Sequence, residues 1–423
     1  MERYQKHTRQ ARRFTVKDAN DDSIQVSLQE HILGHLSEWI PELVRAEIRE
    51  FLGRDSGEHQ ADAQETGSPL CPGSGKPYRN GYHKERLLSS AMGTFPVKLP
   101  RLRVPFESKI IPHYERRTEE LGELLPELYM HGLAAGDFRQ AMRMLLGEHA
   151  PISATTILRL KQEWEEEYKQ WRERPLDSEY LYLWADGVYP KAGPKDEKMA
   201  VLVVVGLNSK GEKEILAIEE GYRESLESWR DLFRKLKRRG LRWAGLMIAD
   251  GLLGLKKALR DTFPKTKYQR CFLHKMRNVL DKLPTKCEEQ AKQMLRDIYH
   301  ALSRAVALEL KERFLERFAK DYPAAANSLE EAGDDLFTYF DFPRSHWKSI
   351  KSTNVIESMF NAVKLRTDAA RRIKTRKSAL FLVFKLLINQ ESRLHKIRGY
   401  RLVRATIEQL RNSQSQRKVR LAA

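Results

Sequence analysis

Two aspartates stand at equivalent places in two separate apolar segments. Asp186 lies in LYLWADGVYP and Asp250 in GLMIADGLLGL, so each ends an apolar run, follows an alanine and precedes a glycine. Carboxylates at the ends of neighbouring strands can converge on one divalent cation, because hard cations prefer oxygen ligands. The repeated pattern favours a metal site over its two structural alternatives, a turn at Asp186 and a helix N-cap at Asp250.

A third acid, Glu357, lies near the start of a predicted helix in the segment STNVIESMFNAVKLRT. Its carboxylate could supply a further oxygen ligand. Asn354 and Glu357 also have the spacing of a capping box, in which the glutamate reaches back to the N-cap residue. Taken by itself, Glu357 is explained better by capping than by chemistry.

A polar cluster in the segment YQRCFLHKMRN places Cys271 and His274 three residues apart, followed closely by Arg277 and Asn278. A structural zinc site usually needs four ligands from two such pairs. The other cysteines of the chain have no close Cys or His partner, so the pattern does not favour zinc. We expect these four residues to lie beside the acidic residues or to contact phosphate.

The composition indicates a polyanionic partner. The 423 residues include 76 Lys and Arg against 58 Asp and Glu, which gives a formal net charge of +18. A hydrophobic share of 41% can build a sizeable core and argues against wholesale disorder. On a folded chain, such a charge points to nucleic acid. A membrane is the weaker alternative, because no apolar run approaches the roughly 20 residues of a spanning helix.

The first residues of the chain and its cysteines favour a cytoplasmic protein over a secreted one. The first residues, MERYQKHTRQARRF, are basic but lack the apolar stretch of a secretory signal. Three scattered cysteines exclude a disulfide framework and fit a reducing cytosol. We therefore expect a cytoplasmic protein of two or three domains.

The stretch 176–275 must position the two aspartates. Its apolar runs predict five strands, with one helix before the fourth strand and one after it. The strands are expected at 180–188, 199–207, 214–219, 245–249 and 267–272. This order predicts a mixed sheet with helices packed on it, an α/β fold.

Three regions precede this stretch. Residues 1–70 contain one amphipathic helix, at 28–52, which Pro41 should kink or divide, and then a polar linker. Residues 71–115 are expected to form a small basic β element. Residues 116–175 are expected to form three short helices, compatible with a DNA-binding helix-turn-helix and equally with a plain helical bundle.

Three regions follow it. Residues 276–350 are predicted to be helical, 351–395 mostly helical and very basic, and 396–423 a basic tail. The run RRIKTRK could track DNA phosphates or form a solvated helix face, and the net charge favours DNA. Its cations are Arg371, Arg372, Lys374, Arg376 and Lys377.

Several of these motifs together resemble the Mutator-type transposases of bacterial insertion sequences. The resemblance rests on YLWADGVY, on IADGLLGLKKAL followed by FPKTKYQRCFLHKMRN, and on KSTNVIESMFNAVKLRT. The segments YRNGYHKERLLSSAMGTFPVKLPRLR, LYMHGLAAGDFRQAM and SATTILRLKQEW also look like the family. The match covers most of residues 76–370 in the family's order, and its QRC-x-x-HK-x-RN block is quite specific.

The resemblance implies a ribonuclease H-like catalytic domain made of residues 176–275 and 351–395. Residues 276–350 would be the helical insertion that the family has before its last acidic residue. The strand order predicted from the apolar pattern agrees with that fold.

The resemblance also implies a DDE triad, which falls on Asp186, Asp250 and Glu357. The basic segment LRTDAARRIKTRKSALFLVFKLL departs from the commoner ending of the family. This departure leaves the role of Arg366, like that of the neighbouring arginines, open without affecting the triad.

Three carboxylates suit DNA cleavage and strand transfer, which are in-line displacements at phosphorus. Two Mg²⁺ or Mn²⁺ ions per active site would stabilise the attacking and leaving oxygens. Asp186 would bridge both ions, while Asp250 and Glu357 would each hold one. Water would free a 3′-OH at the element end, and that 3′-OH would then attack target DNA without a covalent enzyme intermediate.

The expected partners are double-stranded DNA of two kinds, the terminal inverted repeats of the element and its target. The N-terminal arm and the helices at 116–175 are the candidates for recognising the repeats. Since transposition pairs two DNA ends, we expect a homodimer or a larger assembly on DNA. The resemblance places the protein in a bacterial cytoplasm, associated with the nucleoid.

Three alternatives remain at this point. A junction-resolving nuclease of the same fold would typically use four carboxylates and lack the long insertion and the N-terminal segments. A domesticated, catalytically silent DNA-binding protein would keep the fold, but such a descendant often loses one of the three acids. A zinc-dependent structural protein built on Cys271 and His274 is the most distant alternative.

Overall fold

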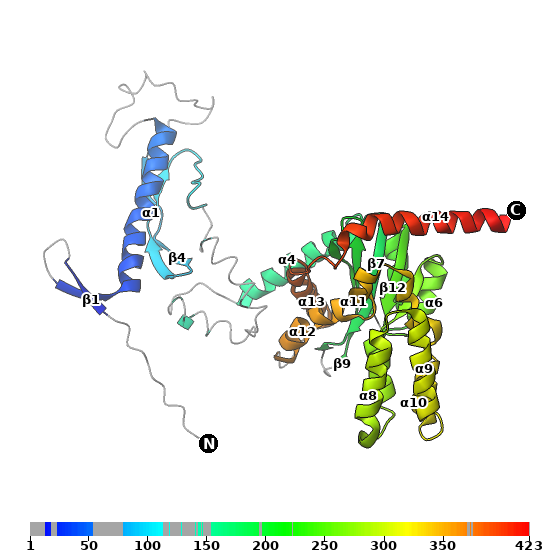
Figure 1. Ribbon diagram of the computed structural model, residues 1–423. Helices are drawn as coiled ribbons and strands as arrows, with labels where there is room; N and C mark the ends of the chain where they lie inside the picture. The colour runs from blue at the N-terminus through cyan, green and yellow to red at the C-terminus, as the bar shows by residue number, and fades with distance from the viewer. Residues whose placement is uncertain are drawn as a thin grey trace. The chain divides into compact units, whose positions relative to one another are not determined.

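The computed structural model describes seven stretches of the chain, together with Ile373 and isolated positions between 118 and 146. The stretches are 13–17, 23–53, 79–112, 154–193, 197–221, 223–369 and 375–422. The chain divides into two compact units, residues 1–160 and 161–423, whose elements are labelled in Figure 1. All three acidic residues predicted to do chemistry belong to the second unit.

The first unit contains the amphipathic helix predicted from the sequence, α1 (Leu28–Leu52). The expected division at Pro41 is wrong, because the helix continues through it. Proline removes only one N–H from the helical ladder. Burial of Pro41 together with Val44, Ile48 and Leu52 supports the helix across that lost hydrogen bond.

The small β element predicted for this unit is present. Its strands are β3 (Arg79–Tyr82), β4 (Arg86–Ser90), β5 (Gly93–Val97) and β6 (Pro100–Leu102). Strand β3 pairs with β6 and β4 with β5, both antiparallel, and their apolar side chains share a core with α1. An unpredicted hairpin, β1 (Arg13–Lys17) with β2 (Ser23–Ser27), precedes α1. The helices expected between 116 and 153 lie outside the described residues, apart from isolated positions; α4 (Ala154–Glu173) follows.

A five-stranded mixed sheet is the centre of the second unit. Its strands are β7 (Glu179–Val188), β10 (Ala200–Asn208), β11 (Lys213–Gly221), β12 (Trp243–Ala249) and β13 (Lys267–Arg270). They lie in the order β11-β10-β7-β12-β13. The first three form antiparallel pairs, whereas β12 runs parallel to both β7 and β13. A short hairpin, β8 (Lys191–Ala192) with β9 (Glu197–Lys198), extends from β7. All five strands of the sheet match those predicted from the sequence.

Helices cover both faces of this sheet. On one face, α5 (Leu226–Arg238) and α6 (Leu253–Thr262) bury Trp229, Phe233 and Leu259 against the strands. On the other face, Tyr182 contacts His346 and Trp184 contacts the segment before α12 (Asn354–Ala369). Burial on both faces explains why β10 reads as one continuous apolar run.

The helices predicted for residues 276–350 are present and have a core of their own. They are α7 (Phe272–Leu280), α8 (Thr285–His300), α9 (Arg304–Phe318) and α10 (Pro323–Glu330). Three short 3-10 turns (Gly333–Leu336, Thr338–Asp341 and Arg344–His346) and α11 (Trp347–Ile350) return the chain to the sheet. This return delivers Glu357 to the strands that carry the two aspartates.

The chain ends in α13 (Arg376–Glu391), a 3-10 turn (Tyr400–Leu402) and α14 (Val403–Ala422). The expected basic tail is therefore a helix over most of its length. The α8–α10 bundle projects from one end of the sheet and α14 crosses the other end (Figure 1). The second placement agrees with an ion pair between Arg411 of α14 and Glu179, the first residue of β7.

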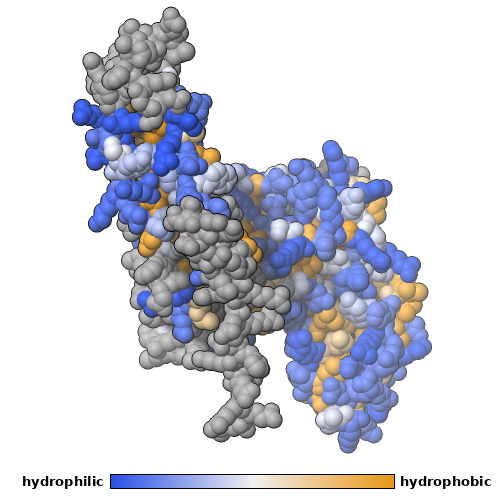
Figure 2. Space-filling model, turned by 90° about the vertical axis from the view of Figure 1, so that its left-hand side faces the viewer, coloured by the Kyte–Doolittle hydropathy of each residue, from blue (hydrophilic) through white to orange (hydrophobic). Residues whose placement is uncertain are grey.

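In the described part of the chain, no helix combines the length and the apolar character needed to cross a membrane. Hydrophilic residues predominate on the face shown in Figure 2, and hydrophobic ones form smaller separate groups.

Candidate active site

Asp186 lies inside a strand and not in a turn. Strand β7 continues to Val188, and Asp186 pairs with Val203 of β10. Its Oδ1 accepts a hydrogen bond from the N–H of Gly187 at 2.8 Å. Side chains alternate between the two faces of a strand, so Asp186 shares a face with Tyr182 and Trp184. The turn considered for Asp-Gly is thus excluded.

Asp250 directly follows β12 and is not a helix N-cap. Helix α6 begins at Leu253, and its N-cap is Leu252, without a side-chain cap. In the parallel pair of β7 and β12, Ala249 is in register with Ala185. The next residues along both strands are Asp250 and Asp186, so the two carboxylates stand side by side at one end of the sheet.

The surroundings of both aspartates disfavour their negative charge. Burial raises the pKa of Asp186 to about 7, against the opposing effect of the Gly187 hydrogen bond. Burial also raises the pKa of Asp250, although His274 and Arg270 oppose this shift. Within the described residues, the buried Oδ1 of Asp250 accepts no hydrogen bond, although His274 Nδ1 lies 3.4 Å from it. A pair of this kind gains stability from any cation that enters between its members.

Glu357 does not form the capping box. Helix α12 begins at Asn354, so that residue is not its N-cap. The N–H of Glu357 bonds instead to the carbonyl of Thr353 at 3.0 Å. The Thr353 hydroxyl donates to Oε1 of Glu357 at 2.6 Å. Thr353 is fully buried and thereby fixes the direction of the Glu357 carboxylate.

His274 links Glu357 to Asp250. Its Nδ1 lies 3.4 Å from Oδ1 of Asp250 and 3.8 Å from Oε1 of Glu357. The Cys271 sulfur and these two carboxylates raise the pKa of His274 to about 9, although burial opposes the shift. At neutral pH the imidazole is therefore protonated and holds a positive charge among the acids.

Cys271 connects this group to the sheet. It is fully buried between β13 and α7, and its N–H bonds to the carbonyl of Ala249 at 2.7 Å. The backbone N–H of Thr353 donates to the Cys271 sulfur at 3.4 Å, and the Thr353 hydroxyl oxygen lies 3.2 Å from the same sulfur. Ligand atoms of Cys271, His274 and Glu357 all lie within 4.8 Å of one another, so this set could hold a metal ion that displaces the proton of His274.

Two neighbours of the acids were not found by sequence reasoning. Thr353 belongs to the KSTNVIES segment, where its place just before the helix was a usable signal. Glu224 has no such signal. It lies over Gly187, where any added Cβ would clash with its carboxylate, and it accepts a hydrogen bond from the Tyr189 hydroxyl. Burial raises the pKa of Glu224, and the charge of Asp250 adds to this effect.

The remaining predicted residues are more dispersed. Arg277 and Asn278 are exposed on α7, one turn beyond His274 and on the same side of that helix. Arg366 is buried in α12. Arg371, Arg372 and Lys374 lie outside the described residues.

The other two cations of the RRIKTRK run begin α13 and are both paired with carboxylates. Arg376 Nε lies 2.7 Å from Glu220 Oε1, and Lys377 Nζ lies 2.6 Å from Glu165 Oε1. The Lys377 side chain is exposed and that of Arg376 partly exposed, so they could exchange these partners for phosphate. Their role in DNA binding remains a prediction.

Comparisons with known proteins assign the family. A family model described as transposase, Mutator family, matches residues 8–396. The transposase for insertion sequence element IS6120 of Mycolicibacterium smegmatis is 39% identical over 284 residues, which cover 67% of this chain and 88% of the relative. That for IST2 of Acidithiobacillus ferrooxidans is 36% identical and covers 60% and 87%. That for ISRM5 of Rhizobium meliloti is 31% identical and covers 82% and 84%. Because the family model matches most of its length, this chain belongs to the Mutator family of transposases.

Proposed function

We propose that this protein cuts the ends of its insertion sequence and joins them to target DNA through a DDE triad of Asp186, Asp250 and Glu357 in a ribonuclease H-like core. The observation that carries the proposal is the convergence of three acids from distant parts of the chain. Two stand side by side on parallel strands, and His274 lies within 4 Å of both the second and the third. The purely structural roles considered for these acids do not apply: Asp186 is not in a turn, Asp250 is not a helix N-cap, and Glu357 is not in a capping box with Asn354.

The acids fit a site for divalent cations. The buried Oδ1 of Asp250 accepts no hydrogen bond among the described residues and has only a 3.4 Å contact with His274, and burial keeps the pKa of Asp186 high. Both features would be relieved by a hard cation with oxygen ligands. When bound, such cations would stabilise the attacking and leaving oxygens of a displacement at phosphorus. Asp186, Asp250 and Glu357 would hold them, and we propose Mg²⁺ or Mn²⁺, two per site.

Side chains around the three acids would help the site to bind a phosphodiester. Thr353 aims Glu357, because its hydroxyl donates to one carboxylate oxygen and leaves the other free. The protonated ring of His274 offsets part of the negative charge that the three acids would otherwise present to DNA. Arg277 and Asn278 extend that side of α7 and would contact phosphates next to the scissile bond.

The proposal also assigns a role to each region of the chain. Residues 176–275 and 351–395 would form the catalytic domain, with 276–350 as its insertion. The regions at 1–70, 71–115 and 116–175 would recognise the terminal inverted repeats, and the RRIKTRK run would track DNA phosphates. Pairing of two ends would need a homodimer or a larger assembly, in a bacterial cytoplasm and on the nucleoid.

A cleavage assay on duplex DNA that carries the element's own ends tests the proposal. Wild type is compared with Asp186→Asn, Asp250→Asn and Glu357→Gln in Mg²⁺ or Mn²⁺. Glu312→Gln, which removes an exposed carboxylate from α9, is the matched control. We expect wild type and control to nick at the element end, and the three triad variants to bind the DNA without cutting it.

Other outcomes are informative. If all proteins bind and none cuts, the chain is a silent DNA-binding protein of the same family. If Glu357→Gln alone keeps cutting, the third ligand lies elsewhere, and Glu224 is the next residue to test. If wild type cuts branched junctions in preference to element ends, the junction-resolving alternative is correct.

A further inference from the structure

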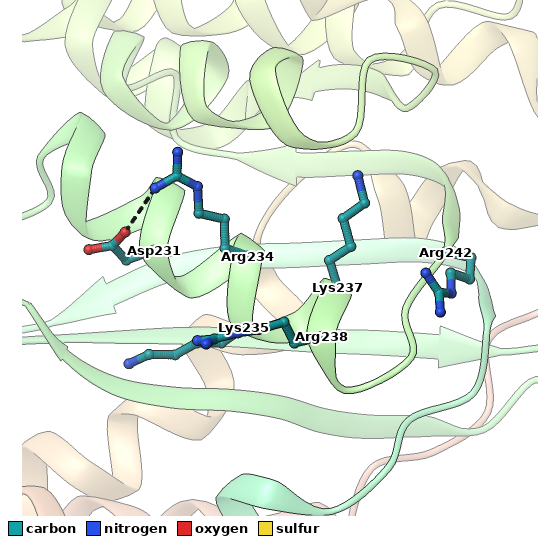
Figure 3. Close-up of a pocket in the computed structure, with 6 residues that line it drawn as sticks. All are labelled: Asp231, Arg234, Lys235, Lys237, Arg238 and Arg242. Carbon is teal, nitrogen blue, oxygen red and sulfur yellow. Dashed lines mark ion pairs between the residues drawn. The ribbon is translucent and has the colours of Figure 1, made fainter.

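A second charged surface lies on the outer side of α5. The buried side of this helix carries Trp229, Leu232, Phe233 and Leu236, so its remaining positions face outward. These positions and the loop that follows line a hollow of about 740 Å³. Its lining residues, drawn in Figure 3, are Asp231, Arg234, Lys235, Lys237, Arg238 and Arg242.

The positive charge of this hollow is only partly compensated. Arg234 lies 3.5 Å from Asp231, the pair marked by the dashed line in Figure 3, and Lys235 lies 2.9 Å from Glu219. Lys237 reaches a backbone carbonyl of Thr262, at 3.5 Å.

Among the described residues, no carboxylate pairs with the exposed side chains of Lys237, Arg238 or Arg242. In contrast, the two described cations of the RRIKTRK run each have a carboxylate partner. Three full charges therefore remain available to an external anion.

The surface extends beyond one hollow. Lys237 and Arg242 also line a neighbouring hollow of about 380 Å³, together with Lys265, Arg411 and Glu179, the last two of which form an ion pair. Their shared lining joins the two hollows into one basic strip. A single small anion would need only one of them, whereas a strip of cations matches a chain of phosphates.

The strip is at the opposite end of the sheet from the acids. Arg242 immediately precedes β12, whereas Asp250 immediately follows it. Seven residues of strand lie between them, so they are eight steps apart, which is about 26 Å at the usual rise. One phosphodiester cannot contact both, so an occupant of the strip is a different DNA segment or a distant part of the same one.

We infer that Lys237, Arg238 and Arg242 form a second binding site for the backbone of duplex DNA, separate from the segment that is cut. The inference rests on the proposed function, since strand transfer handles element end and target at the same time. The first hollow offers charge without aromatic side chains on which unpaired bases could stack, and in the second Phe263 is buried and Trp243 is only partly exposed. Contacts of this kind position a duplex and carry no sequence information.

The test compares the full-length wild type with Lys237→Gln/Arg238→Gln/Arg242→Gln. The matched control, Lys286→Gln/Arg296→Gln/Lys320→Gln, removes the same charge from exposed positions of the α8–α10 bundle. Binding to a short duplex without element ends is measured in EDTA against salt concentration. Three lost phosphate contacts should make the slope of log K against log salt shallower by about 2.7. Between about 50 and 200 mM salt, the wild type would lose roughly 40-fold more affinity than the variant.

An unchanged slope in the triple variant overturns the inference, as does an equal loss in the control. A slope that changes for duplex RNA but not for duplex DNA overturns it in favour of an RNA site. The result does not depend on cleavage. If wild type fails to cut, the proposed function falls while the salt slope still decides whether this strip binds DNA. Unchanged thermal unfolding of both variants ensures that they are folded.

Discussion

The charged side chains at the two ends of the central sheet differ in burial and in pairing. At one end, a protonated His274 lies within 4 Å of Asp250 and Glu357, the buried Thr353 bonds to Glu357, and Asp186 stands beside Asp250 on the neighbouring strand. At the other end, Lys237, Arg238 and Arg242 stand exposed and without carboxylate partners among the described residues. Charges at the first end are half-buried and coupled, whereas those at the second are solvated and independent.

This difference predicts different responses to substitution. Buried, coupled groups change each other's pKa and orientation, so their effects are large and do not add. Exposed cations are screened by salt and contribute little to folding, so their effects are small and additive.

The largest expected effect is a gain in stability when an acid is removed. Burial raises the pKa of Asp186 from 3.8 to about 7, so the native state binds this proton more tightly than the unfolded chain. The metal-free protein therefore loses stability as the pH rises from about 4 to about 7. Three pKa units correspond to roughly 4 kcal/mol. At about pH 8, Asp186→Asn should stabilise the metal-free protein by up to this amount, as measured by urea unfolding in EDTA.

The control for this prediction is a substitution in α5, beside the basic strip. Asp231→Asn removes an exposed carboxylate from α5 and should change stability by less than about 0.5 kcal/mol. At about pH 3, below the pKa of 3.8 that Asp186 has in the unfolded chain, Asp186 is mostly protonated in both states, so the gain from Asp186→Asn should nearly vanish. If Asp186→Asn stabilises the protein equally at every pH, the difference in stability from wild type comes from packing and not from charge.

The sheet could be predicted from the sequence because its pattern is local. Buried strands such as β10 and β12 are short apolar runs, and their limits need no knowledge of distant residues. The same holds for Asp186 and Asp250, since each follows an apolar run directly. Pro41 was misjudged because the burial that supports α1 there depends on packing in the folded unit.

The rest of the site depends on contacts that the sequence does not show. Glu224 reaches the acids only because Gly187 leaves room for it, across 37 positions of the chain. Thr353 meets Cys271 only after the whole α8–α10 bundle has intervened. The basic strip arises where the end of α5 meets the start of β12, and the +18 net charge gave no indication of its place.

The next effect concerns the hydroxyl that aims Glu357. Thr353→Val keeps the shape of the side chain but removes the donor at 2.6 Å from the carboxylate. Partners that orient metal ligands are typically worth 10–100-fold, so we expect the cleavage rate to fall by roughly that factor. DNA affinity should stay unchanged, and Thr353→Ser should restore cleavage because it restores the hydroxyl.

Coupling at this end can be measured with a second substitution. Thr353 and His274 share contacts with Glu357, so the loss in Thr353→Val/His274→Asn should be smaller than the product of the single losses. Losses that multiply would show that the two residues act separately. An unchanged cleavage rate in His274→Ala would remove this histidine from the site altogether.

The smallest effect belongs to single cations of the strip, and its additivity is the sharpest test of the comparison. Lys237→Gln and Arg242→Gln should each make the salt slope for duplex DNA shallower by about 0.9, and the double variant by about 1.8. Between about 50 and 200 mM salt this is a roughly three- to fourfold effect for each residue. Urea unfolding should not distinguish these variants from wild type, because both side chains are exposed. If the double variant instead loses no more than either single one, the two cations hold a single phosphate together, and this end of the sheet is as coupled as the end that carries the acids.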